Sequence, residues 1–496
     1  MVEKELHALI KQIQIRGCEE QTMEVKSAHY GCPEKLYDTI SAFSNQNNGG
    51  TFLFGLDEKE GFKKVGVYDA QDLQKKVKVM EYCEQMTPVV RPVFTICNEG
   101  TLVFLSAEIP PVDITDRPCF KTAKGRLQGS YIRVGEADKP MTEYEVYSFE
   151  AFRKKYRDDI RPAAGVSFSA LDQEKLESYL LKKRRERPHL ASASIEQQYE
   201  LTGITRDGQI TMTALLLFGL YPQAYYPQLS IIATHVPSNK MGIVDAEGNR
   251  FIDSKRIEGT LPDMLDGALS FVRTNMRVAT KIDSKTGKRV DLPQYPIDAV
   301  REAILNALVH RDYSFHTEGM PIQLQMFSDR MEITNPGGLY GRLTIDQLGN
   351  VQPDTRNPVL VTAMETLGET ENRYSGIPTI KYAMEKHALP APLFKDSRGE
   401  FSVTLYNTTA KTEPHANMQQ DTYKSNIIDE KGLIEFCRSE KSRAEIIEFL
   451  NIPSAQYALK RYLEPLIETG AIRMTLPDKP RSPKQKFISA FELEDV

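Results

Sequence analysis

The segment IDAVREAILNALVHRDY, residues 297–313, constrains the fold around it more than any other stretch of the chain. Its apolar residues recur at helical spacing, which predicts an amphipathic helix with one buried face. The other face carries Glu302, Asn306 and His310 one helical turn apart, so a carboxylate, an amide and an imidazole share one side. The polar face of an ordinary helix and a ligand-binding face both fit this spacing.

Length and composition limit the class of protein. A chain of 496 residues should hold roughly three or four domains. The net charge of -5 is mild, so any nucleic-acid binding must use local basic patches. The six cysteines form no CxxC pair, which argues against a zinc site and a disulfide framework. The N-terminal residues lack the apolar core of a signal peptide, and no run reaches membrane length. We therefore expect a cytoplasmic protein with no membrane partner.

The patterns along the chain predict a multidomain α+β protein. Residues 1–155 alternate helical and strand patterns, and residues 156–290 read as a connector helix followed by an α/β bridging region. Residues 291–407 contain the opening helix, the hairpin pattern IQLQMFSDRMEITNPGG and a last strand, FSVTLYN. Residues 408–426 have few large apolar side chains and read as a linker. Residues 427–496 show helix, turn, helix and two strands around a basic loop, which is a winged helix-turn-helix pattern.

Three carboxylates near the N-terminus form the first candidate site. Glu19 and Glu24 precede the glycine-opened strand GGTFLFGLDE, which ends at Asp57. Oxygen ligands of this kind can hold Mg²⁺, or Mn²⁺ in its place, and such an ion can activate water against a phosphodiester. Lys26 lies two residues past Glu24 and could contact a phosphate. An ordinary charged surface explains the same residues.

The segments EEQTMEVKSA, ISAFSNQNNGGTFLFGLDEKEGFKKVGV and GSYIRVGEADKPMTEYEV resemble the Schlafen AlbA-like domain over roughly residues 15–150. The resemblance implies nucleic-acid binding, with Lys26 and Arg133 as expected contacts. Some eukaryotic members cleave RNA with two Glu and one Asp, and by motif these fall on Glu19, Glu24 and Asp57. Many bacterial members only bind.

This sequence departs from the Schlafen pattern at two positions. Glu20 stands where the family has Ser, and Val25 stands where it has Phe. These departures weaken the inference that the three acids are catalytic.

The segments ALVHRDYS, SDRMEITNPGGLYGRLT, TRNPVL, RYSGIPTI and GEFSVTLYN resemble the GHKL-like domain known as the C-terminal part of a RecG-type helicase. The chain has no Walker A motif GxxxxGK[ST], so the resemblance does not imply a helicase. In GHKL ATPases the ExxxN pair is the N-box, whose Asn holds magnesium and whose Glu orients or deprotonates water. The resemblance implies ATP and Mg²⁺ as ligands, with Asn306 on the metal and Glu302 on the water. The expected nucleotide site comprises Glu302, Asn306, His310, Asn335, Gly337, Gly338, Ser375 and Gly376.

The glycine boxes of this region are incomplete. Asn335-Pro336-Gly337-Gly338 stands where GHKL proteins carry DxGxG, and the usual Asp is absent. The second loop is reduced to Tyr374-Ser375-Gly376. Adenine recognition and turnover are both open questions at this point, and the ATPase is at most weak.

The C-terminal module carries the last candidate contacts. A recognition helix in the major groove with a basic wing on phosphates would use this pattern. A dimerisation or regulatory module is the alternative. The expected nucleic-acid contacts are Lys460, Arg461, Arg473, Arg481, Lys484 and Lys486.

Three functions are compatible with these features. The first is an ATP-binding, nucleic-acid-binding regulator resembling a transcriptional regulator, which we expect to be a homo-oligomer. The second is a metal-dependent Schlafen-type nuclease gated by ATP, with a role in phage defence. The third is a scaffold whose GHKL-like domain only oligomerises.

Overall fold

The computed structural model describes residues 1–72, 78–282, 289–368, 375–397 and 399–407, and within the C-terminal part residues 433–434, 436–450, 463, 466–467, 469–476 and 485–490. The chain divides into two compact units, Met1–Thr412 and Glu413–Val496. The predicted linker, 408–426, lies outside the described residues.

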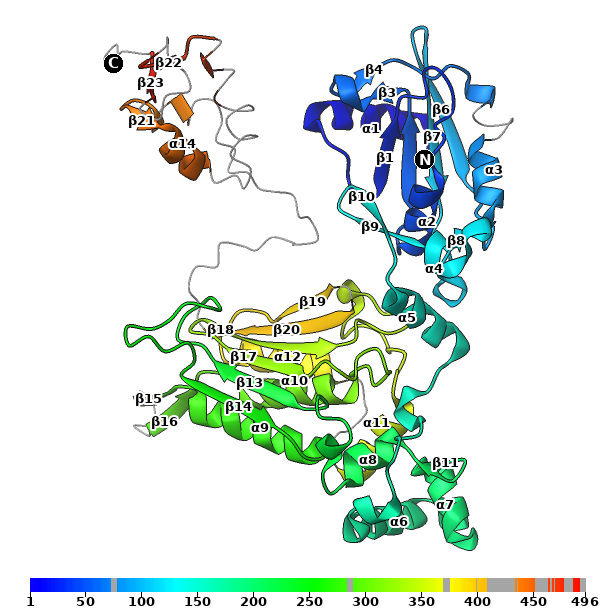
Figure 1. The fold of residues 1–496 in the computed structure, drawn as a ribbon, viewed down its shortest axis with the longest axis vertical. Helices are drawn as coiled ribbons and strands as arrows, with labels where there is room; N and C mark the ends of the chain where they lie inside the picture. The colour runs from blue at the N-terminus through cyan, green and yellow to red at the C-terminus, as the bar shows by residue number, and fades with distance from the viewer. Residues whose placement is uncertain are drawn as a thin grey trace. The chain divides into compact units, whose positions relative to one another are not determined.

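The N-terminal part is built on a four-stranded sheet with the order β1-β2-β7-β6 (Figure 1). Its strands are β1 (Met23–Lys26), β2 (Gly50–Phe54), β6 (Val93–Glu99) and β7 (Leu102–Ile109). β1 pairs with β2 in parallel, and the other pairs are antiparallel. The sheet carries helices on both faces because side chains alternate along β2. Leu53 packs with helix α1 (Glu3–Arg16), whereas Phe52 and Phe54 pack with α2 (Tyr37–Asn45).

Shorter elements surround this sheet. They are β3 (Leu56–Asp57), β4 (Lys63–Lys64), α3 (Lys78–Glu84), β5 (Met86–Thr87), β8 (Phe120–Lys121), α4 (Gly125–Gly129), β9 (Tyr131–Val134) and β10 (Ala137–Pro140). Helix α5 (Glu143–Lys154) follows, and its start is fixed by a capping box between Thr142 and Glu145.

A six-stranded sheet with the order β14-β13-β17-β18-β20-β19 dominates the rest of the larger unit (Figure 1). Its strands are β13 (Ile231–His235), β14 (Asp253–Ile257), β17 (Ile322–Met326), β18 (Arg330–Pro336), β19 (Leu393–Ser397) and β20 (Glu400–Tyr406). β13 and β17 are parallel, and the other pairs are antiparallel. The helices against this sheet are α9 (Leu261–Asn275), α10 (Ile297–Val309) and α12 (Gly376–Lys386). The predicted α/β sandwich, hairpin and last strand are confirmed.

One buried core runs through residues 163–405 and crosses the predicted boundary at residue 290. β13 and β14 lie in the stretch expected to bridge two domains, yet they extend the six-stranded sheet through the β13–β17 pair. The structure therefore joins the bridging region to the GHKL-like region. The remaining elements here are α6 (Gln173–Glu186), α7 (Ile195–Thr202), β11 (Thr205–Arg206), β12 (Gln209–Ile210), α8 (Met212–Phe218), β15 (Val278–Ile282), β16 (Arg289–Pro293) and α11 (Pro358–Leu367).

The smaller unit contains a three-stranded antiparallel sheet with the order β21-β23-β22. Its elements are β21 (Lys441–Ser442), α14 (Arg443–Leu450), β22 (Ile472–Met474) and β23 (Lys486–Ser489). Arg473 and Lys486 are exposed on these strands. The other predicted contacts, Lys460, Arg461, Arg481 and Lys484, lie outside the described residues. The winged helix is not confirmed and stays a prediction.

Candidate functional site

Helix α10 presents the polar line that its sequence predicts. Apolar residues such as Ala303 and Ile304 are buried on one face, while Glu302 and Asn306 are half-buried. The amide Nδ2 of Asn306 donates a hydrogen bond to Oε1 of Glu302 at 3.1 Å. Because the nitrogen is engaged in this way, the Asn306 amide oxygen is the atom that can face a cation. His310 is the residue that ends the helix.

The predicted nucleotide-site residues gather around one cavity of about 580 Å³. Drug-sized ligands occupy pockets of roughly 300–1,000 Å³, so the volume suits a nucleotide. Segments far apart in sequence contribute to it, from α10, the end of β18 and the start of α12. The lining includes all of the residues expected from the motifs: Glu302, Asn306, His310, Asn335, Gly337, Gly338, Ser375 and Gly376.

Two glycines allow these segments to approach each other. A Cβ atom on Gly376 would lie 2.2 Å from Oε1 of Glu302 and 3.0 Å from Nδ2 of Asn306. The start of α12 therefore lies directly against the Glu302–Asn306 pair. Gly337 has a φ of +104°, and its Cβ would lie 2.8 Å from Cβ of Asp312. Side chains at these positions would push the cavity walls apart.

Asn335 carries a buried polar atom in the cavity wall. The residue is only 5% exposed and lines the cavity. Its Oδ1 has no hydrogen-bond partner among the described residues. A buried polar atom left in this state costs about 1–3 kcal/mol, so it calls for a partner.

The titratable groups of the cavity are shifted by their surroundings. Burial raises the pKa of Glu302 above its usual range, against the opposing hydrogen bond from Asn306. Desolvation in the concave site and the charge of Arg356 lower the pKa of His310 to about 4, although the residue is exposed at the cavity wall. His310 is therefore neutral near pH 7 and can donate or accept a hydrogen bond there.

The sequence prediction missed two buried charges beside this cavity. Arg356 lines it and forms an ion pair with Asp312 at 2.5 Å. Arg356 Nη2 also donates to the carbonyl oxygen of Gly338 at 3.1 Å. Both residues occur in segments that carry the GHKL resemblance, TRNPVL and ALVHRDYS. Their positions in those motifs were the sequence signal that could have identified them.

The acids predicted as a metal site have a different arrangement. Arg133 extends from β9 into the space between Glu19, Glu24 and Asp138, and its side chain is only 1% exposed. Its Nη1 lies 2.7 Å from Glu24 Oε2 and 3.0 Å from Asp138 Oδ1, and its Nη2 lies 3.4 Å from Glu19 Oε2. A guanidinium therefore occupies the space between these carboxylates. The prediction that Arg133 contacts nucleic acid is wrong, because the side chain is buried among acids.

Asp57 does not complete the group. Its Oδ1 accepts a hydrogen bond from the backbone N–H of Lys59 at 3.0 Å and caps a short 3₁₀ helix. Glu24 also pairs with Lys26. Among the described residues, which include all three predicted acids, no group of three or more His, Cys, Asp or Glu is placed to hold a metal ion. The residues present therefore do not fit the predicted metal site, and we derive no cleavage step from them.

Two known families match separate parts of the larger unit. Residues 19–142 match the family Schlafen, AlbA_2, and residues 319–405 match the family described as putative ATP-dependent DNA helicase recG C-terminal. The chain carries a Schlafen AlbA_2 domain and a RecG-C-terminal-type ATPase-like domain. The second match begins after α10, so Glu302 and Asn306 lie before the matched range of the ATPase-like domain.

The smaller unit has a match that the sequence analysis did not anticipate. Residues 431–488 match the C-terminal domain of Fic-like proteins, described as filamentation induced by cAMP. No protein of curated function matches the chain. Among the described residues, no helix is long and apolar enough to cross a membrane.

Two solved structures show weaker similarity. The DIP2311 protein of Corynebacterium diphtheriae is 17% identical, with 92% of each chain covered and a TM-score of 0.38. The N-terminal domain of a putative ATP-dependent DNA helicase RecG-related protein from Nitrosomonas europaea is 25% identical, covering 28% of this chain and 93% of that domain, with a TM-score of 0.23. TM-scores below 0.5 do not establish a shared fold, so neither similarity carries functional weight.

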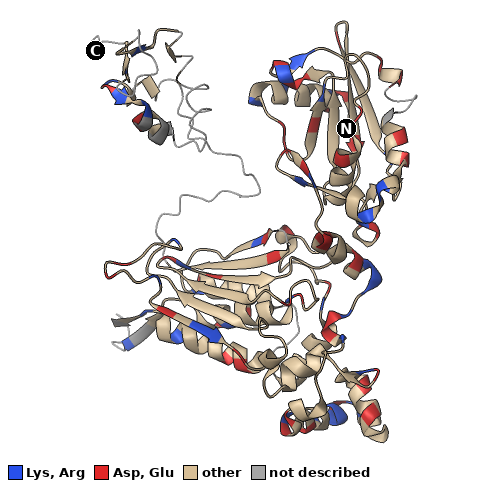
Figure 2. Cartoon of the chain, viewed as in Figure 1, with Lys and Arg blue, Asp and Glu red and all other residues tan. Residues whose placement is uncertain are grey.

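The Schlafen AlbA_2 domain also carries basic residues beside aromatic rings, one of which, Lys124, lies 3.9 Å from Asp38. Figure 2 shows Lys and Arg gathered around β8 and α4. Lys121 Nζ lies 3.4 Å from the centroid of the Tyr37 ring, and Lys124 Nζ lies 5.5 Å from that of Tyr131. Cations beside aromatic rings are the combination that contacts phosphates and stacks on bases.

Proposed function

We propose that the protein is an ATP-binding, nucleic-acid-binding regulator. The observation that carries the nucleotide part is the gathering of the motif residues, the Glu302–Asn306 pair among them, around one cavity of about 580 Å³. The AlbA_2 and ATPase-like domains support a nucleic-acid-related protein that uses nucleotide. The proposal requires no cleavage of nucleic acid.

The amide of Asn335 suits adenine. Its oxygen can accept from the exocyclic amine while its nitrogen donates to a ring nitrogen, as amide side chains do with adenine elsewhere. The carboxylate of the usual DxGxG box could only accept, because an ionised acid has no donor. Replacement of Asp by Asn at this position is therefore compatible with adenine recognition.

The Glu302–Asn306 pair suits a magnesium-bound phosphate chain. Magnesium accepts oxygen ligands and usually keeps several waters, so one amide oxygen from Asn306 is a sufficient protein contribution. Bound magnesium would neutralise charge on the phosphates. Glu302, whose pKa is raised by burial, is placed beside Asn306 to hold a water or take its proton.

The nucleic-acid part of the proposal rests on two surfaces, each within its own unit. The first is the cluster of Lys121, Lys124 and nearby tyrosines on the AlbA_2 domain. The second is the exposed strand pair that carries Arg473 and Lys486, although Lys486 also pairs with Glu440 at 3.2 Å. The homo-oligomer expected from the sequence finds no support in this single chain and stays a prediction.

A direct test uses the purified full chain with labelled tRNA and duplex DNA, with and without magnesium and ATP. We expect a mobility shift that weakens as salt rises, because binding would release counterions from the phosphates. We also expect ATP binding by calorimetry and no cleavage. Absence of both a shift and ATP binding would reject the proposal. Cleavage that requires magnesium and is lost in Glu24→Ala would favour the nuclease instead.

A further inference from the structure

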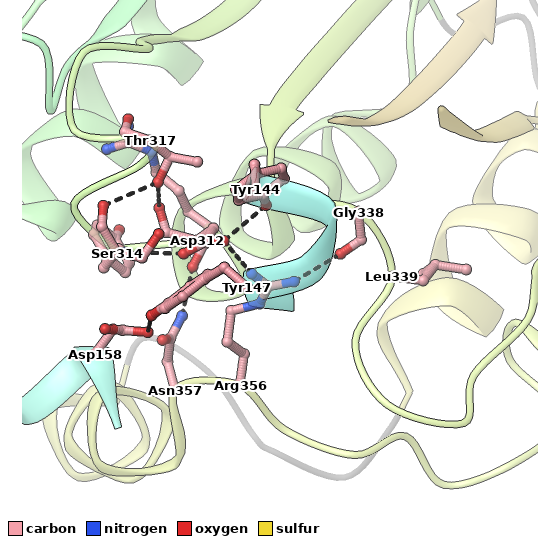
Figure 3. Close-up of polar contacts among 12 residues, drawn as sticks. Tyr144, Tyr147, Asp158, Asp312, Ser314, Thr317, Gly338, Leu339, Arg356 and Asn357 are labelled. Atoms are coloured by element: carbon pink, nitrogen blue, oxygen red, sulfur yellow. Dashed lines mark hydrogen bonds and ion pairs between the residues drawn. The ribbon is translucent and has the colours of Figure 1, made fainter. Parts of the chain in front are cut away.

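Helix α5 connects the AlbA_2 domain to the wall of the nucleotide cavity. Its Glu150 forms an ion pair with Arg126 of α4 in the AlbA_2 domain. On the cavity side, the hydroxyl of Tyr144 donates to Asp312 Oδ2 at 2.8 Å (Figure 3). One turn later, the hydroxyl of Tyr147 donates to Asp158 Oδ2 at 2.8 Å. The same short helix therefore contacts both domains through polar side chains.

Asp312 links Tyr144 to Arg356. The carboxylate is 1% exposed and accepts from both the Tyr144 hydroxyl and the Arg356 guanidinium (Figure 3). Burial alone would raise the pKa of Asp312, but the charge of Arg356 and the hydrogen bonds hold it below its usual range. Asp312 is therefore ionised near pH 7, and it fixes the position of the arginine.

Arg356 has donor capacity to spare. Its side chain is only 8% exposed, and the residue lines the cavity. Its Nε has no hydrogen-bond partner among the described residues. A desolvated arginine in a cavity wall suits an anion, because its planar guanidinium matches phosphate oxygens.

We propose that Arg356 binds the β- or γ-phosphate of the nucleotide and that Tyr144, acting through Asp312, positions it for this contact. The proposal rests on the nucleotide site proposed above. The charge of the ligand supports it, because a nucleotide triphosphate carries several negative charges and the cavity wall also contains the acids Glu302 and Asp354. Without a nearby cation those acids would repel the phosphates.

The position of α5 gives this contact a consequence. A phosphate that engages Arg356 competes with Asp312 for the same guanidinium, and the Tyr144 hydrogen bond must respond. Nucleotide binding and the orientation of helix α5, which follows the AlbA_2 domain, are then linked. Such a linkage of free energies is reciprocal. Tyr144 is a positioning residue in this scheme and does not touch the nucleotide.

The first test measures ATP, ADP and AMP affinity of the full chain by calorimetry for the natural protein and for Arg356→Lys and Arg356→Gln. We expect AMP affinity to change by less than about twofold and ATP affinity to fall about tenfold or more, since charged hydrogen bonds contribute about 1.5–3 kcal/mol. Arg356→Lys keeps a positive charge beside Asp312, so this variant can still be measured if Arg356→Gln does not fold. An equal loss for ATP and AMP would place Arg356 at the nucleoside or at the α-phosphate, which AMP also carries, and would overturn the proposal, as would no loss.

The second test compares Tyr144→Phe with Tyr147→Phe, a matched change on the same helix that removes a hydrogen bond to Asp158 instead. We expect Tyr144→Phe to lower the ratio of ATP to AMP affinity several-fold and Tyr147→Phe to leave it unchanged. Equal ratios in both variants would overturn the positioning role. If the natural protein binds neither ATP nor AMP, the proposed function itself fails, which is a different result from either of these.

Discussion

Two sets of closely spaced polar residues were candidate ligand sites in the sequence: the Glu19–Glu24 cluster of the AlbA_2 domain and the Glu302–Asn306 pair of the ATPase-like domain. In the structure they differ in what lies between their polar atoms. In the first, the guanidinium of Arg133 lies between the carboxylates. In the second, the polar atoms face a cavity of about 580 Å³. The first cluster already holds a cation of the chain between its acids, whereas the second lines a cavity that a ligand can enter.

The largest effect should come from removing the internal cation. Arg133→Met would leave Glu19, Glu24 and Asp138 buried without their partner, which typically costs about 3–5 kcal/mol. Denaturant unfolding at pH 7 measures this loss. Lys26→Met is the control, because Lys26 is 30% exposed and its pair with Glu24 should contribute less than about 1 kcal/mol. Unchanged stability in Arg133→Met, or a gain of magnesium binding, would mean that the acids form a ligand site after all.

The opposite outcome is expected for the open pair. Asn306→Ala should reduce magnesium-dependent ATP binding about tenfold or more, since it removes the amide oxygen proposed to face the ion. Stability should change by less than about 1 kcal/mol, because the side chain is half-buried at a cavity wall. Calorimetry with and without magnesium gives the first value and thermal unfolding the second. Asn98→Ala, at an exposed position on β6, is the control. Equal ATP affinity in a folded Asn306→Ala protein would remove the contrast between the two regions.

A smaller effect is expected at Asn335, the residue proposed to contact the base. Asn335→Ala should lower the preference for adenine over guanine nucleotides by about tenfold, because one bidentate amide contact contributes roughly 1–3 kcal/mol of discrimination. Competition binding with ATP and GTP measures the ratio. Thr334→Ala, on the adjacent strand position outside the cavity, should leave that ratio unchanged. If both variants keep the same ratio, Asn335 does not read the base.

Local patterns predicted much of the fold and of the nucleotide site. The periodicity of residues 297–309 fixed helix α10, and the alternation in IQLQMFSDRMEITNP gave the β17–β18 hairpin. The motif residues also met around one cavity. The helix and the hairpin depend on neighbours in the chain, which is why a single sequence reveals them, whereas the set of cavity residues was expected from the family resemblance.

Features that depend on distant partners were not predictable in the same way. Arg133 occurs in the strand YIRV and looks like an available cation until Glu19, Glu24 and Asp138 are brought around it. Arg356 and Tyr144 are more than two hundred residues apart, and only the fold brings both to Asp312. The domain boundary predicted at residue 290 could not be tested from local patterns for a similar reason. β13, before it, pairs in parallel with β17, after it, and this pairing is non-local.

The smallest expected effect concerns Glu19 and tests whether its cluster is balanced. Burial raises the pKa of Glu19 from its usual value to about 7, against the hydrogen bond from the N–H of Val25. The folded state therefore keeps this proton at pH values where the unfolded state has lost it, and unfolding free energy must fall as pH rises from about 4.5 to about 7. Glu19→Gln cannot lose a proton and still offers an oxygen to Val25. We expect the variant and the natural protein to differ little at pH 5, and the variant to be more stable by about 1–2 kcal/mol at pH 8, after allowance for solvent screening. Denaturant unfolding at both pH values measures the difference. Parallel pH curves for the two proteins would show that Arg133 already holds the Glu19 carboxylate ionised, which would make the cluster a fully satisfied ion-pair network.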